Sequence, residues 1–131
     1  MRVYISGSFA ARDRLRKEKE KLISAGHEVV SSWLEEIPPP LSLTRNEFWR
    51  KLAVKDLGEV RAADLVIVDT LMKSTTGGTY CELGSALSAV IPKAVWLIGK
   101  IDCVFETLTD RQFQNWEDAH VALEMITEGI Q

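Results

Sequence analysis

Short apolar runs alternate along the chain with longer segments in which apolar residues recur at helical spacing. The clearest run is "DLVIVD" at 64–69, a continuous apolar stretch that is typical of a strand buried on both faces of a parallel sheet. The runs at 2–6, 27–33 and 93–99 predict three more strands, and "FQNW" at 113–116 is compatible with a last short one.

The segments between these runs are predicted to be helices, because they are longer and their apolar residues recur every three or four positions. Gly26 stands where the C-cap of the first helix is expected, and Ser42 or Thr44 could cap the second helix. Three consecutive prolines turn the segment before that cap into a loop. The helices expected on this basis run from about 11 to 25, from the cap to about 62, from 79 to about 90, and from 117 to 128.

Alternating strands and helices predict an α/β fold, with a doubly wound parallel sheet of about five strands and helices on both faces. Ligands of such sheets bind beyond the carboxyl ends of the strands. We therefore expect four features to share one edge of the sheet: the turn at 6–8, the region of Trp33, Asp69 with the loop that follows it, and the start of the helix at 79.

Composition narrows the class of protein. A chain of 131 residues has the size of one domain, so 1–131 is expected to form a single domain. A net charge of -3 gives no reason to expect a nucleic-acid polymer as partner. No apolar run is long enough for a membrane span, the N-terminus lacks the apolar core of a signal peptide, and the two cysteines suggest no disulfide framework. A cytoplasmic location is the expectation.

Glu82, in "TTGGTYCELGSAL" at 75–87, has two interpretations. Thr79 and Glu82 have the spacing of a capping box, in which the carboxylate would bond the Thr79 amide. Alternatively, a carboxylate in the first turn of a helix at the carboxyl edge points into the ligand crevice, and Gly77 and Gly78 let a substrate approach the backbone. The two interpretations do not exclude each other.

Other candidates for ligand contact surround this helix. The turn with Gly7 and Ser8 is either a plain turn into a helix or a source of amides and hydroxyls for a phosphate or sugar. Phe9 and Trp33 are either core and rim aromatics or platforms for a base. Asp69 ends its strand on the ligand side, and no His, Cys and carboxylate cluster suggests a metal.

Three segments together resemble the nucleoside 2-deoxyribosyltransferase family, which includes the 2′-deoxynucleoside 5′-phosphate N-hydrolases. These segments are "VYISGSF", "KDLGEVRAADLVIVD" and "GGTYCELGSAL", and the resemblance covers residues 2 to about 100. It implies a flavodoxin-like fold, cleavage of the N-glycosidic bond of a deoxynucleoside or its 5′-monophosphate, no cofactor, and a homodimer or higher homo-oligomer. The small-molecule partner it implies is a nucleoside or nucleotide.

The resemblance also assigns roles to residues. Glu82 matches the nucleophile that forms a covalent glycosyl-enzyme, Tyr4 the tyrosine that orients it, and Asp56 an acid that acts on the base or the sugar. From the chemistry, Asp56 or Asp69 is the candidate that protonates the leaving base. Gly7 and Ser8 match substrate contacts. The matched or neighbouring positions expected to bind substrate are therefore Gly7, Ser8, Phe9, Trp33, Asp69, Ser74, Thr75, Gly77 and Gly78.

Departures from the family pattern leave the acceptor open between a second base and water. The acid that often precedes the nucleophile in transferases is absent from 75–78, and Ala10 stands where the hydrolases have an arginine, with Arg12 nearest. Glu106 falls near the position that a partner subunit supplies, where a glutamate would repel a phosphate. The alternatives are a nucleotide-binding sensor without chemistry and, less favoured, a flavodoxin-like FMN protein.

Overall fold

The computed structural model describes residues 1–36, 42–73 and 77–129. Its five strands form one parallel sheet in the order β2-β1-β3-β4-β5. The elements follow one another as β1 (Arg2–Ser6), η1 (Phe9–Ala11), α1 (Arg12–Ser24), β2 (Glu28–Val29), η2 (Ser32–Glu35), α2 (Arg45–Ala62), β3 (Leu65–Asp69), α3 (Gly78–Leu87), β4 (Ala94–Ile98), η3 (Val104–Leu108), β5 (Arg111–Phe113) and α4 (Trp116–Thr127).

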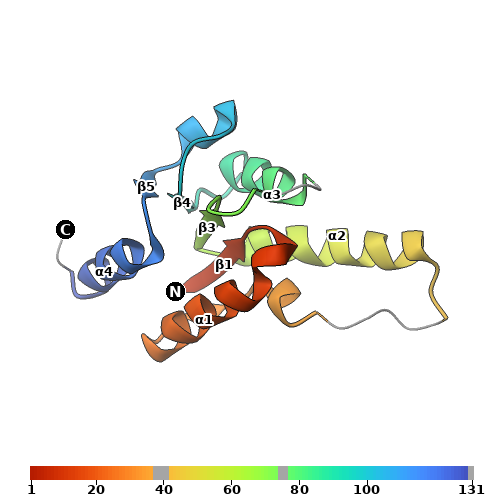
Figure 1. The fold of residues 1–131 in the computed structure, drawn as a ribbon, viewed down its shortest axis with the longest axis horizontal. Helices are drawn as coiled ribbons and strands as arrows, with labels where there is room; N and C mark the ends of the chain where they lie inside the picture. The colour runs from red at the N-terminus through yellow and green to blue at the C-terminus, as the bar shows by residue number, and fades with distance from the viewer. Residues whose placement is uncertain (37–41, 74–76, 130–131) are drawn as a thin grey trace.

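Helices cover both faces of the sheet, as the alternating pattern predicted (Figure 1). On one face α1 lies beside α4, joined to it by a 2.8 Å contact between Glu18 Oε2 and His120 Nε2. Helices α2 and α3 pack together on the other face. The core is built from the apolar runs at 2–6, 64–69 and 93–99, and all five residues of β3 are buried.

Local signals explain most of the element boundaries. Gly26 ends α1 with φ 94°, a conformation that glycine adopts without steric cost. Thr44 caps α2, and its hydroxyl accepts the Glu47 amide at 3.2 Å. Among the described residues, no helix is long and apolar enough to cross a bilayer.

Three boundary predictions were wrong. The strand expected at 27–33 is limited to Glu28–Val29, and Ser32–Glu35 forms a 3₁₀ turn because the Trp33 indole donates to the Ile5 carbonyl at 2.7 Å. "FQNW" is divided between two elements, since β5 ends at Phe113 and α4 begins at Trp116. Helix α3 ends at Leu87, three residues before its predicted end.

Candidate active site

The carboxylate of Glu82 faces the end of β1. Tyr4 and Ser6 are two residues apart on that strand, so their side chains project to the same face of the sheet, the face that α3 covers. The Tyr4 hydroxyl donates to Glu82 Oε2, and the Ser6 hydroxyl donates to Glu82 Oε1 at 2.7 Å. Tyr4 and Ser6 are fully buried, so each carboxylate oxygen has one donor that is shielded from water.

The capping-box interpretation of Glu82 is wrong. Helix α3 begins earlier than that motif requires, because Gly77 takes a left-handed conformation with φ 79° and serves as the N-cap. No side chain caps the helix there, and the buried Thr79 hydroxyl has no hydrogen-bond partner among the described residues. The Glu82 carboxylate therefore accepts hydrogen bonds from side chains of β1 rather than from the backbone of its own helix.

Asp56 on α2 is a second carboxylate of this region. Its side chain is 22% exposed, and its Oδ1 atom is buried without a hydrogen-bond partner among the described residues. Burial and then the nearby charge of Glu82 raise the pKa of Asp56 to about 7, although Lys55, 3.8 Å away, opposes the shift. At neutral pH a substantial fraction of Asp56 is protonated and can donate a proton.

Burial also raises the pKa values of the other two groups, Glu82 and Tyr4. Burial raises the pKa of Glu82, while the hydrogen bonds from Tyr4 and Ser6 lower it in part. The pKa of Tyr4 is raised above its usual value, first by burial and then by the charge of Glu82. Tyr4 consequently remains a hydrogen-bond donor, and the pair behaves as a carboxylate held by a neutral phenol.

The aromatic candidates divide into one buried and one exposed side chain. Trp33 is 6% exposed and its indole N–H is bonded to β1, which leaves little surface for a substrate. Phe9 is 59% exposed at the same edge, with its ring centroid 6.5 Å from that of Trp33 and the Arg12 guanidinium 4.6 Å above its face. Phe9 is thus the aromatic that a ligand can reach.

The remaining candidates that the structure describes lie at or near this edge. Gly7 is closely packed, since a Cβ there would meet the Leu15 side chain at 2.9 Å. Ser8 is buried and its side chain makes no capping hydrogen bond to η1. Gly77 and Gly78 form the start of α3. Ser74 and Thr75 lie outside the described residues.

Asp69 reaches the predicted edge, but its oxygens are already engaged. Its fully buried carboxylate accepts two hydrogen bonds from Arg14, at 2.8 and 2.9 Å, one from the Trp116 indole at 2.7 Å, and one from the Leu71 amide at 3.1 Å. Asp69 therefore joins β3 to α1, α4 and the following loop. This geometry favours Asp56 over Asp69 as the acid.

We expect Asp69→Asn to destabilise the fold by about 2 kcal/mol, because the buried amide accepts weaker hydrogen bonds from Arg14 and Trp116 than the carboxylate does, and its NH₂ group faces donors. Urea unfolding measures the loss. The control is Asp13→Asn, which removes an exposed carboxylate paired with Arg16 and should change stability by less than about 0.5 kcal/mol. Unchanged stability of Asp69→Asn, together with weaker substrate binding, would contradict this role and assign Asp69 to the substrate.

The position of Glu106 differs from the one expected from the sequence. Its fully buried carboxylate accepts hydrogen bonds from the amides of Asp102 and Cys103 at the start of η3. The side chain therefore lies in the interior of the chain and does not project from its surface. Repulsion of a phosphate across an interface is not a role that this position supports.

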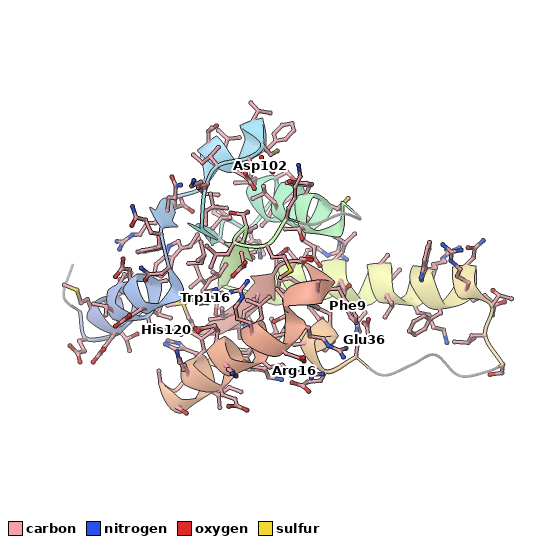
Figure 2. The ribbon with its side chains drawn as sticks, viewed as in Figure 1. Phe9, Arg16, Glu36, Asp102, Trp116 and His120 are labelled. Carbon is pink, nitrogen blue, oxygen red and sulfur yellow. The ribbon has the colours of Figure 1, made fainter. Side chains whose placement is uncertain are left out.

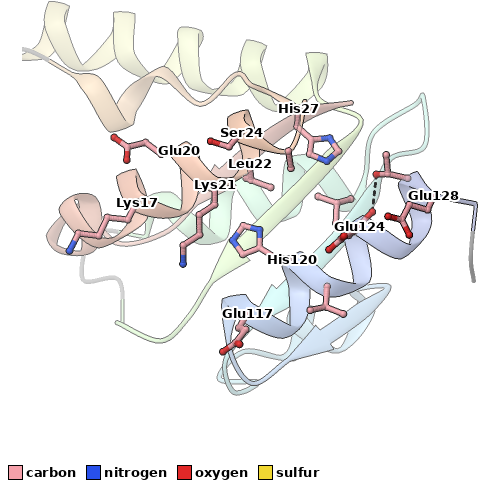
Figure 3. A pocket seen from close by; sticks show the side chains of 14 residues that line it. Lys17, Glu20, Lys21, Leu22, Ser24, His27, Glu117, His120, Glu124 and Glu128 are labelled. Carbon is pink, nitrogen blue, oxygen red and sulfur yellow. Dashed lines mark hydrogen bonds between the residues drawn. The ribbon is translucent and has the colours of Figure 1, made fainter.

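A wide groove of the described residues lies away from these carboxylates. It has a volume of about 1140 Å³ and lies between α1 and α4. Its lining residues include Lys17, Lys21, His27, His120 and Glu124 (Figure 3). Figure 2 shows His120 and Trp116 on the side of α4 that faces α1. This groove contains neither Glu82 nor Asp56, and its charged lining residues, six lysines and glutamates out of fourteen residues, are all exposed to solvent. The chemistry therefore favours the carboxyl edge of the sheet over this groove.

The turn at 6–8 was expected at this edge, but the hydrogen bond from Ser6 to Glu82 was not, although Tyr4 and Ser6 share one face of the strand. The partners of Asp69, namely Arg14 and Trp116, were missed because they come from elements distant in sequence. Among the described residues, no group of three His, Cys, Asp or Glu side chains is arranged to hold a metal ion.

Known structures share this fold. The chain is similar to a 2-deoxyribosyltransferase from Bacillus psychrosaccharolyticus, with a TM-score of 0.72 and 22% identity over 92% of this chain and 90% of that chain. It is also similar to the Clostridium botulinum CMP N-glycosidase BcmB, with a TM-score of 0.57 and 14% identity over 95% and 99% of the two chains.

The chain has the 2-deoxyribosyltransferase fold. The resemblance seen in the sequence is thereby confirmed at the level of the fold, as is the flavodoxin-like sheet. No protein-family model and no curated protein sequence matches the chain. Because one fold hosts many activities, the fold alone does not determine what the protein does, and the side chains at the carboxyl edge of the sheet decide its chemistry.

Proposed function

We propose that the protein cleaves the N-glycosidic bond of a 2′-deoxynucleoside or its 5′-monophosphate through a covalent glycosyl-enzyme. The observation that carries the proposal is the Glu82 carboxylate, bonded by Tyr4 and Ser6 and close enough to Asp56 to raise the pKa of that acid. Two carboxyl groups with different protonation states are what a two-step displacement at an anomeric carbon requires.

In the first step a Glu82 oxygen forms a bond to C1′ of the sugar while the bond from C1′ to the base nitrogen breaks. The electron pair of that bond leaves with the base, which takes the proton of Asp56. In the second step a water or another base attacks C1′, and the bonding pair returns to the Glu82 oxygen. The proton of the acceptor passes to Asp56, which restores the starting state.

The two similar structures support this class of substrate. One is a 2-deoxyribosyltransferase and the other a CMP N-glycosidase, so both names describe enzymes that act on a bond between a sugar and a base. A nucleotide-binding sensor with the same fold is the rival, and such a protein has no need for the bonded Tyr4 and Glu82 pair.

Assays with dGMP, dCMP, deoxyadenosine and AMP, each with and without a free acceptor base, test the proposal by chromatography. Release of base from at least one deoxy substrate is the expected result. Exchange of the added base into product indicates a transferase, and release of free sugar or sugar phosphate alone indicates a hydrolase. Thermal stabilisation by a nucleotide without any product would favour the sensor.

We also propose that the protein is a homodimer or higher homo-oligomer. The first half of α2 projects beyond the sheet (Figure 1), and the apolar side chains exposed along this helix include Trp49 and Val54, which are 53% and 64% exposed. Within the 18 residues of α2, only Val60 is buried. A helix with so little packing is marginal in water, which supports a second copy covering it. A sedimentation mass of a single chain would contradict this.

A further inference from the structure

The carboxylate of Glu82 has one neutral donor on each oxygen, and the donor on Oε1 is a serine hydroxyl. We propose that Ser6 is a catalytic residue that speeds the breakdown of the glycosyl-enzyme by stabilising the Glu82 carboxylate as it leaves C1′. This inference rests on the proposed function. It follows from the 2.7 Å contact between Ser6 Oγ and Glu82 Oε1 and from the complete burial of Ser6.

The hydroxyl of Ser6 binds the charged form of Glu82 more strongly than the esterified form. A hydrogen bond to an ionised carboxylate is about twice as strong as one between neutral groups. When Glu82 forms an ester with C1′, both of its oxygens lose their share of the negative charge, so the bond from Ser6 weakens whichever oxygen attacks. The bond regains its strength as the bond between Glu82 and C1′ breaks.

Such a donor is needed because burial makes Glu82 a poor leaving group. Removal from water raises the pKa of Glu82, which makes the carboxylate a better nucleophile in the first step and a worse leaving group in the second. Asp56 protonates the departing base in the first step, but in the second step the departing group is Glu82 itself. Ser6 and Tyr4 are the donors that contact it there.

The chain offers a matched control in Ser31. Its hydroxyl accepts the Ile5 amide at 3.0 Å and is 1% exposed, so Ser31→Ala removes a buried hydroxyl that supports the same strand but does not touch Glu82. Ser6→Ala and Ser31→Ala both remove one buried hydroxyl. A purely structural role for Ser6 predicts that the two variants behave alike.

The experiment measures two quantities in the full chain. The first is the titration of the Glu82 carboxyl by ¹³C NMR without substrate, for which Ser6→Ala should reduce the acid dissociation constant about tenfold. The acid limb of the pH profile of kcat/KM should move to higher pH by about one unit, because the first step needs ionised Glu82.

The second quantity is the time course of base release after rapid mixing. Ser6→Ala should show a burst of about one equivalent per site, a steady rate about tenfold lower, and accumulation of the glycosyl-enzyme in the intact mass. Ser31→Ala should match the wild type in all three.

The inference is overturned if Ser6→Ala shows the same Glu82 titration and the same steady rate of base release as Ser31→Ala. An unshifted Glu82 titration overturns it as well, and that measurement needs no turnover. Absence of base release from the wild-type chain would instead contradict the proposed function. Failure of the inference and failure of the proposed function are therefore distinguishable.

Discussion

Glu82→Gln is expected to reduce base release by about a thousandfold or more while leaving the protein folded. The amide has nearly the shape of the carboxylate, but it carries no negative charge and cannot form the glycosyl ester. Product formation is followed by chromatography with the best substrate of the wild type, and thermal unfolding checks that the variant is folded.

Glu124→Gln is the matched control, because Glu124 lies in the large groove between α1 and α4 and away from the sheet edge. We expect it to retain full activity. Loss of activity in Glu124→Gln with an active Glu82→Gln would move the active site to the groove and contradict the account.

Asp56→Asn is expected to lower kcat by about a hundredfold or more, because the base then leaves without a proton. The pKa of Asp56 is raised to about 7, so the wild-type rate should fall as the pH rises through 7 and the acid loses its proton. The variant should lack this alkaline limb. With a substrate whose leaving group needs no proton, Asp56→Asn should lose much less of the wild-type rate. An equal loss of rate with both substrates would contradict the assignment of Asp56 as the acid.

The same substitution should raise the stability of the protein at pH 8. Burial raises the pKa of Asp56 above its usual value of 3.8, so the folded state binds the proton more tightly than the unfolded chain. Above pH 7 the folded state therefore holds a disfavoured buried charge, and this destabilisation is relieved as the pH falls through 7. Melting temperatures of Asp56→Asn and the wild type should differ at pH 8 and converge at low pH.

The fold could be predicted largely because its signals are local. The apolar run at 64–69 and the glycine at 26 specify β3 and the end of α1 without help from distant residues. The 27–33 segment failed because its later half is held by a tertiary contact, the bond from the Trp33 indole to β1. No pattern within the segment itself announces that contact.

The site was predicted less completely for the same reason. The pairing of Tyr4 with Glu82 was expected and is present. The capping box failed, because a Thr-x-x-Glu pattern is local whereas the donors that engage Glu82 lie 76 and 78 residues away. The hydrogen bonds that occupy the Asp69 carboxylate could not be predicted from the sequence either, since Arg14 and Trp116 reach it from two other helices.

The most direct test of the glycosyl-enzyme uses a 2-deoxy-2-fluoro analogue of the preferred substrate, in which fluorine slows both steps and lets the intermediate accumulate. Intact mass and peptide mapping then locate the sugar. We expect one sugar per chain, attached to Glu82, and none on Glu82→Gln. Label on another residue, or steady turnover of the analogue without any label, would contradict it.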